Sequence, residues 1–434
     1  MHRLKAPCSI LLALAIIIVP VPAPAYSVLT HEELIDLAWN DSIRPLLVAR
    51  FPGISEAALN EAHAYAYGGS AIQDMGYYPF GKQFFSNLTH YVRTGDFVAS
   101  LFRNAHNANE LAFAVGAMSH YLGDSTGHSE CINLSTPVEF PKLERKYGEV
   151  VTYDENPHAH IRTEFAFDID QLTHHRLAPA AYLHHIGLKV PRALVERAFY
   201  ETYGLHLREV LGPEIPAMRS YRTSVRTFIP PFAYAEGVLH RKHFPPDVTD
   251  EAFEQFARDV QEADYQRHWK GSRKDAGFVT HVLAVVIFIV PKIGPLSDLA
   301  IRGPNRETEQ LYVHSVNDTM KQFRAVLQQL REQPDPPVIL ANRDLDTGAL
   351  LRPGAYALTD ETYATLLQRI TADPARKVPY GIRRDLLAFY SDPNAPIVTK
   401  RDRKAWEQVQ ENLATLHEMP LRQAEQPGIV AADH

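Results

Sequence analysis

Two short segments carry imidazole and carboxylate side chains at intervals of four residues. SHYLGDSTGHS has this pattern, and HIRTEFAFD repeats it forty residues later. On a helix, residues four apart lie on one face, with a small drift from turn to turn. Imidazoles and carboxylates on one helix face are typical zinc ligands, whereas a solvated polar face is the plainer interpretation of either helix alone. The residues concerned are His120, Asp124, His128, His160, Glu164 and Asp168.

Further potential metal ligands stand upstream of these two segments. His31 falls near the start of a predicted helix, Asp74 lies in a loop rich in glycine and aromatics, and His90 lies on the next predicted helix. Each residue alone is weak evidence for a metal. Without Asp168, the whole set comprises five imidazoles and three carboxylates, and we expect their side chains to point into one cleft.

The first 25 residues have the features of an export signal. Arg3 and Lys5 precede the apolar run ILLALAIIIVPV, and Ala23-Pro24-Ala25 has the form of a cleavage site. A membrane anchor is the alternative, but this run is shorter than the roughly 20 apolar residues that span a bilayer. We therefore predict export, with cleavage after Ala25 and Tyr26 as the first mature residue.

The cysteine count and the charge limit the possible functions. Cleavage would leave Cys131 as the only cysteine, so the exported protein must be held by its core or by metal rather than by an intramolecular disulfide. The 434 residues include 44 basic and 51 acidic ones, a net charge of −7 that becomes −9 without Arg3 and Lys5. This balance argues against an extended nucleic-acid-binding surface. The chain contains neither HExxH nor G-x-S-x-G, which argues against a metallopeptidase and a serine hydrolase.

Helical periodicity dominates the chain and strand-like alternation is scarce, which predicts an all-α protein. Residues 30–33 have the form of a capping box and would place His31 at the first helical position. The next predicted helix covers residues 55–67 and stops at Gly68-Gly69, where the loop GSAIQDMGYYPFG begins. Further helices are predicted over KQFFSNLTHYV, ELAFAVGAMSHYLGDS and HIRTEFAFDIDQL.

The chain divides into four predicted parts. Residues 1–25 are the signal peptide, and residues 26–270 form the main helical domain. Residues 271–332 contain the apolar stretch 278–291, which is either a buried helix or an interfacial membrane contact, and the helix after it. Residues 333–434 begin with a connector rich in proline and glycine and continue as a small helical region.

The order of these residues resembles the zinc-dependent phospholipase C family and its relatives, the single-strand-specific zinc nucleases. Those proteins are exported, all-α and hold three zinc ions, and their ligands begin with the mature N-terminal residue, usually Trp. The resemblance implies the same kind of domain here, and it covers roughly residues 26–168. The matching positions are Tyr26, His31, Asp74, His90, His120, Asp124, His128, His160 and Glu164.

Two departures from the family pattern affect these assignments. Tyr26 replaces Trp, which the site can tolerate because the amine and carbonyl of this residue would be the ligands. Three residues rather than five separate Asp124 from His128, and this leaves Glu130 as an alternative ligand. We favour His128 because imidazole is the better zinc donor.

The second helical segment also leaves a choice open. His158 competes with His160, and His160 is favoured because only it lies one turn from Glu164. Asp168, one turn further on, is expected either behind the ligands or at the surface.

The resemblance implies three zinc positions and a hydrolytic reaction. Zinc lowers the pKa of water that it binds towards ~7 and neutralises charge on phosphate oxygens, so water can attack phosphorus without a side-chain nucleophile. Asp74 would also orient this water or accept its proton. The implied ligand sets are Asp74, His90, His120 and Asp124; His128, His160 and Glu164; and Tyr26, His31 and a shared Asp124.

The ligand set alone does not choose between a phospholipid and a nucleic acid. Tyr77, Tyr78 and Phe80 are candidate substrate-binding residues that could cage a choline head group or stack a base, or belong to the core. The acidic balance and the apolar stretch 278–291 favour a phospholipid and a peripheral membrane contact. The alternatives are a single-strand nuclease or nucleotidase with the same site, and a non-catalytic zinc-stabilised exported protein. The sequence does not indicate the oligomeric state.

Overall fold

The computed structural model describes residues 27–78, 80–178, 180–212, 214–225, 250–263, 303–333 and 337–422. Within these ranges every extended regular element is a helix, and β-structure is limited to two isolated bridges. The all-α prediction is therefore confirmed. None of the described helices is long and apolar enough to cross a membrane. The signal peptide, Tyr26 and the apolar stretch 278–291 lie outside the described residues.

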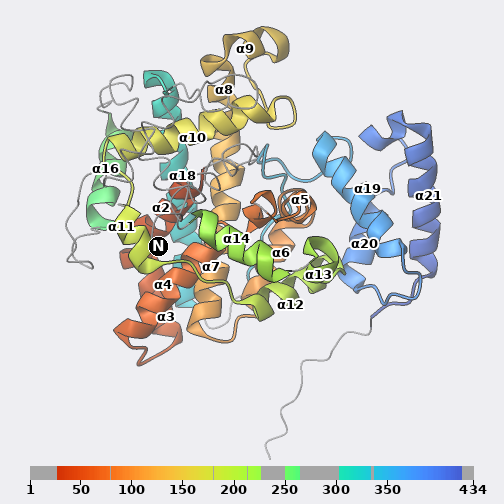
Figure 1. Ribbon diagram of the computed structural model, residues 1–434, viewed down its shortest axis with the longest axis horizontal. Helices are drawn as coiled ribbons and strands as arrows, with labels where there is room; N and C mark the ends of the chain where they lie inside the picture. The colour runs from red at the N-terminus through yellow and green to blue at the C-terminus, as the bar shows by residue number, and fades with distance from the viewer. Residues whose placement is uncertain are drawn as a thin grey trace, which may run out of the picture.

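The helices follow one another with short connections (Figure 1). In the first half they are α2 (Val28–Ala38), the π-helix η1 (Trp39–Ile43), α3 (Arg44–Arg50), α4 (Glu56–Ser70), the 3-10 helix η2 (Gln73–Tyr77), α5 (Gln83–Tyr91), α6 (Thr94–Arg103), α7 (Ala108–Gly127), the π-helix η3 (His128–Ile132), α8 (Asn133–Glu139), α9 (Pro141–Tyr147) and α10 (Pro157–Thr173). After these come α11 (Ala180–Ile186), α12 (Arg192–Tyr203), α13 (Leu207–Leu211), α14 (Glu214–Thr223), α16 (Glu251–Ala263), α18 (Arg306–Glu332), α19 (Ala357–Thr371), α20 (Tyr380–Phe389), η6 (Val398–Arg401) and α21 (Arg403–Glu418).

Helices α4 and α7 pack closely along their lengths, and glycines make this approach possible. A Cβ atom added at Gly69 would lie 2.1 Å from the carbonyl oxygen of Phe113, and one at Gly116 would lie 2.1 Å from that of Ala66. The predicted helix end at Gly68-Gly69 is wrong, because α4 continues to Ser70. These glycines serve the contact between the two helices rather than the end of one of them.

Gly116→Ala is expected to destabilise the protein by roughly 1–3 kcal/mol or more, because the new methyl group overlaps the backbone of α4. Chemical denaturation of the purified variant would measure this change. Asn109→Ala, in the first turn of the same helix, provides a control that should stay close to the wild type. Wild-type stability of Gly116→Ala would show that α4 and α7 do not approach as closely as described.

The start of α2 is held by a distant carboxylate instead of a local capping box. The helix begins at Val28, before the predicted start at His31. Asp168 of α10 accepts hydrogen bonds from the backbone amides of Leu29 and Thr30, both at 3.1 Å, and from the Thr30 hydroxyl at 2.6 Å. The capping-box prediction is therefore wrong, since Asp168 satisfies free N–H groups of the first turn.

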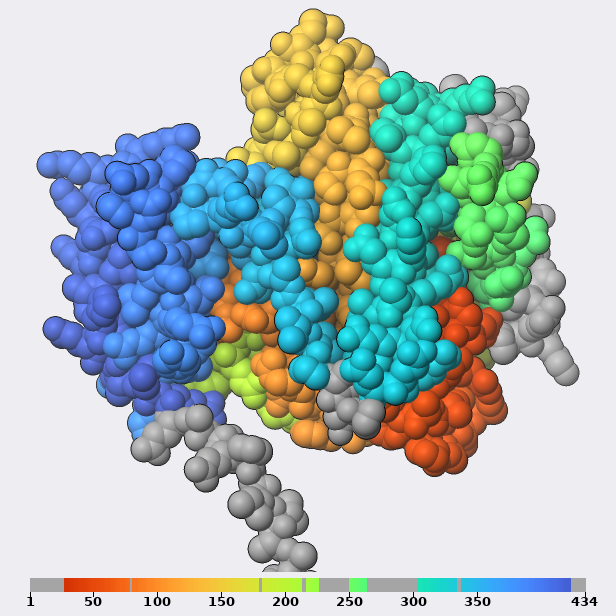
Figure 2. All heavy atoms as spheres, turned by 180° about the vertical axis from the view of Figure 1, so that it is seen from behind, coloured from red at the N-terminus to blue at the C-terminus, as the bar shows by residue number. Residues whose placement is uncertain are grey.

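The region after α18 consists of an irregular segment followed by three helices. Residues 337–356 contain turns and one bridge, as the proline- and glycine-rich connector predicted, and α19 to α21 follow on one flank (Figure 1). From behind, this segment lies between α18 and the C-terminal helices and covers part of α7 (Figure 2). The Tyr121 hydroxyl of α7 donates to the carbonyl of Ala341 at 2.7 Å, which anchors the crossing.

Candidate metal centre

The eight described candidate ligands come from six helical elements and are all at most 1 % exposed. They therefore lie in the interior of the protein, whereas an open cleft was expected. Their ligand atoms gather in three groups, and in each group these atoms lie within 4.8 Å of one another. The groups are His31, His120 and Asp124; Asp74, His90 and His120; and His128, His160 and Glu164.

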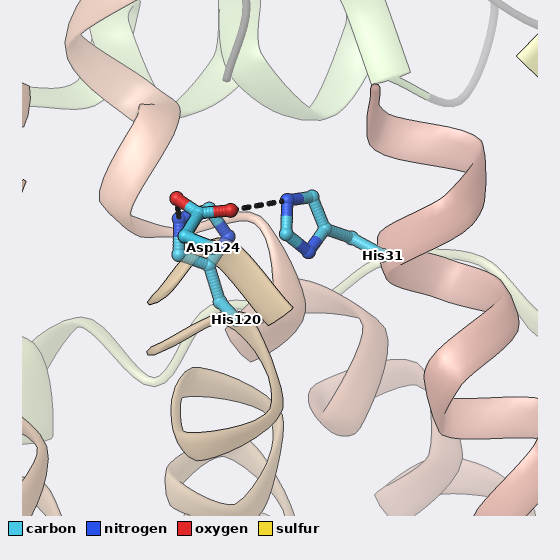
Figure 3. A group of neighbouring side chains, drawn as sticks. All are labelled: His31, His120 and Asp124. Atoms are coloured by element: carbon cyan, nitrogen blue, oxygen red, sulfur yellow. Dashed lines mark ion pairs between the residues drawn. The ribbon is translucent and has the colours of Figure 1, made fainter. Parts of the chain in front are cut away.

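Asp124 stands between three imidazoles. Its Oδ1 is 3.1 Å from His31 Nε2, and its Oδ2 is 2.9 Å from His120 Nε2 and 3.2 Å from His90 Nε2 (Figure 3). Burial by itself would raise the pKa of Asp124, but the contacts with His120 and His31 outweigh burial and leave this pKa well below its usual range. The two oxygens of this carboxylate thus face two different groups, which is the geometry of a bridging ligand.

Asp74 completes the neighbouring group from the loop before α5. Its Oδ1 is 3.3 Å from His90 Nε2 and 3.8 Å from His120 Nε2. The 3-10 helix η2 brings Asp74 to this place, and its own side chain is fully buried. Neither oxygen of Asp74 has a hydrogen-bond donor among the described residues, so both remain available to a cation.

Backbone carbonyls fix which nitrogen of each imidazole faces the centre. His90 Nδ1 donates to the carbonyl of Ser86 at 2.7 Å, and His120 Nδ1 donates to that of Ser70 at 2.9 Å. A neutral imidazole that donates through Nδ1 keeps its lone pair on Nε2. The two Nε2 atoms lie 3.5 Å apart and face carboxylate oxygens. Lone pairs that converge on anionic oxygens repel unless a proton or a cation lies between them, and this arrangement therefore suits a metal ion.

The third group joins η3 to α10. His160 Nε2 and His128 Nε2 lie 3.1 Å and 3.6 Å from Glu164 Oε1. Burial, and next the neighbouring His128, place the pKa of His160 well below its usual value. Burial and the charge of Asp124 raise the pKa of Glu164 well above its usual value. A metal that enters this group would therefore displace a proton from Glu164.

The structure separates the ligands from their sequence competitors. His128 begins a π-helix and is 1 % exposed, whereas Glu130 in the same turn is exposed. Because a π turn is wider than an α turn, the side chain of His128 leaves the row of Asp124 and reaches Glu164. His160 is buried and His158 is exposed, so only His160 lies in the third group.

The aromatic candidates occupy three different environments. The Tyr77 ring lies 5.8 Å from that of His90, next to the ligands. The Tyr78 ring packs 5.4 Å from that of Tyr221 in the core. Phe80 is 75 % exposed. Of the three, Tyr77 alone is placed beside the candidate metal centre by these contacts.

The family comparison agrees with this geometry. A model described as zinc-dependent phospholipase C matches residues 30–212. These residues belong to the zinc-dependent phospholipase C family. The family segment contains all eight described candidate ligands, and the resemblance seen in the sequence is confirmed for it. No curated protein and no solved structure matches the chain.

Two residues beyond the zinc-dependent phospholipase C segment contact a candidate ligand. His128 Nδ1 donates to the carbonyl of Leu345 at 2.8 Å and lies 3.6 Å from Asp346 Oδ1. The sequence analysis missed both residues and treated them as part of a connector. The only available signal was the pair of carboxylates in NRDLDTG, which by itself indicates a turn as readily as a site.

A fourth group of potential ligands is already balanced by a side chain. Asp170, His174 and Glu309 converge where α10 ends and α18 begins. Arg176 Nη1 lies 2.9 Å from Glu309 Oε1, and His174 Nδ1 lies 3.3 Å from Asp170 Oδ1. The guanidinium supplies the positive charge that a metal would bring, so this group is an ion-pair network that links the two helices.

Proposed function

We propose that this protein is an exported zinc-dependent hydrolase that cleaves phosphodiesters, with phospholipids as the substrate class. The observation that carries the proposal is the convergence of imidazole Nε2 atoms and donor-free carboxylate oxygens inside a zinc-dependent phospholipase C segment. A site of this kind suits zinc because nitrogen and carboxylate ligands are those that zinc prefers. Bound zinc would activate water and neutralise charge on the phosphate.

The residues of the chain would then have distinct roles. Asp74 and His90 would hold one zinc with His120 and Asp124, and His128, His160 and Glu164 would hold a second. His31 would hold a third together with Asp124 and the amine of Tyr26. Asp74 would in addition orient the attacking water or take its proton, because its second oxygen also has no donor among the described residues.

A phospholipid substrate is favoured by what surrounds the ligands. Tyr77 beside His90 offers an aromatic face to a cationic head group. The net charge of −7 does not favour a long nucleic-acid strand. Apart from this aromatic face, the described residues do not settle the head group.

Metal analysis of the mature protein, combined with a substrate panel, tests this function. We expect bound zinc at up to three equivalents and hydrolysis of short-chain phosphatidylcholine, with single-stranded DNA cleaved more slowly. A chelator should abolish hydrolysis and added zinc should restore it. Faster cleavage of DNA would establish the nuclease alternative. Full zinc occupancy without turnover of any phosphodiester would establish a non-catalytic zinc-stabilised protein.

A further inference from the structure

The segment of residues 341–348 binds to three elements that carry or adjoin candidate zinc ligands. Leu345 N donates to the backbone carbonyl of His90 on α5 at 3.1 Å, and the side-chain amide of Asn133 donates to the carbonyl of Asp346 at 2.7 Å. A Cβ atom at Gly348 would lie only 2.2 Å from the carbonyl of Ser125, so the turn presses directly on α7. The whole segment lies after the family match, which ends at residue 212.

This segment determines how His128 is presented to the third group. The carbonyl of Leu345 can only accept a hydrogen bond, so His128 Nδ1 must carry the proton. The lone pair of His128 is therefore on Nε2, which faces Glu164. Asp346 Oδ1 lies 3.6 Å from the same Nδ1 and adds a negative charge behind the ring.

Asp346 is itself held in one orientation. Its Oδ2 accepts a hydrogen bond from the Tyr91 hydroxyl at 2.8 Å and another from the Tyr356 hydroxyl at 2.7 Å. The residue is 3 % exposed. With Oδ2 held by two hydroxyl groups, Oδ1 stays beside the imidazole of His128.

We propose that Asp346 is a positioning residue for His128 and that the region after the family segment thereby completes the second zinc position. This inference rests on the proposed zinc site. A carboxylate beside the N–H of a ligating histidine orients the ring and makes it a stronger donor to the metal. Family membership alone would not identify such a residue, because Asp346 lies outside the matched segment.

Asp346→Asn in the full mature chain tests the proposal, with zinc affinity measured by competition with a chromophoric chelator. The amide keeps the size of the side chain but removes its charge from beside Nδ1. We expect one zinc equivalent to bind about 10- to 100-fold more weakly, with the other equivalents unchanged. Asp344→Asn is the matched control: Asp344 is equally buried in the same turn, and its carboxylate contacts Thr359 and Thr347 instead of His128.

A second variant separates positioning from folding. Tyr356→Phe keeps Asp346 but removes one hydroxyl donor from it, and it should weaken the same zinc equivalent by a smaller factor. Near-ultraviolet circular dichroism of each variant reports whether the native packing persists. Wild-type affinity in Asp346→Asn, or equal losses in Asp346→Asn and Asp344→Asn, would overturn the proposal. A wild-type protein that binds no zinc would overturn the proposed function first and this role with it.

Discussion

Purified Asp124→Asn is expected to lose zinc from two positions and to have no measurable phosphodiester hydrolysis. The two oxygens of Asp124 face different ligand groups, with His31 on one side and His90 and His120 on the other. An amide has one oxygen, and its NH₂ group cannot bind a cation. Zinc content by atomic absorption and the initial rate on a soluble phosphodiester measure both effects.

Asp168→Asn is the control for this loss. Asp168 is also fully buried, but its hydrogen bonds go to the first turn of α2 and not to a ligand side chain. We expect a loss of about 1 kcal/mol in unfolding free energy, as for a weakened helix cap, with zinc at the groups of His90 and His128 retained. Equal zinc losses in the two variants would show that Asp124 does not bridge.

Protein that begins at Tyr26 is expected to bind one zinc more than protein with an additional N-terminal Met-Ala. A peptide nitrogen is a poor ligand because its lone pair is delocalised into the amide. A free α-amine, with an ordinary pKa of about 7.7–8.0, can give up its proton to a metal at neutral pH. The third position would then form from this amine, His31 and Asp124, whose side chains are already 3.1 Å apart. Zinc content and hydrolysis rate of the two forms measure the difference.

His31→Ala placed in both forms sharpens this experiment. In the form that begins at Tyr26 it should remove the same zinc equivalent that the extension removes. In the extended form it should cause little further loss, because the position is already incomplete. Equal zinc content and equal rates in the extended and mature forms would mean that the N-terminal amine is not a ligand and that His31 has another role.

Local sequence determined the parts of this centre that depend on one helix turn. His120 with Asp124, and His160 with Glu164, are four residues apart, and α-helical geometry alone brings each pair together at about 3 Å. The helical periodicity around them was equally local, and it sufficed to predict an all-α protein. The family resemblance added the order of the remaining ligands.

Only the tertiary structure decided how the separate pieces meet. The cap of α2 comes from Asp168, 138 residues after Thr30, so no local capping signal could predict it. His128 is oriented by Leu345, 217 residues further along the chain. Burial also distinguishes His128 from Glu130, which sequence spacing left open. These outcomes depend on which surfaces of distant helices pack together, because a buried polar group must find its partner wherever the chain places one.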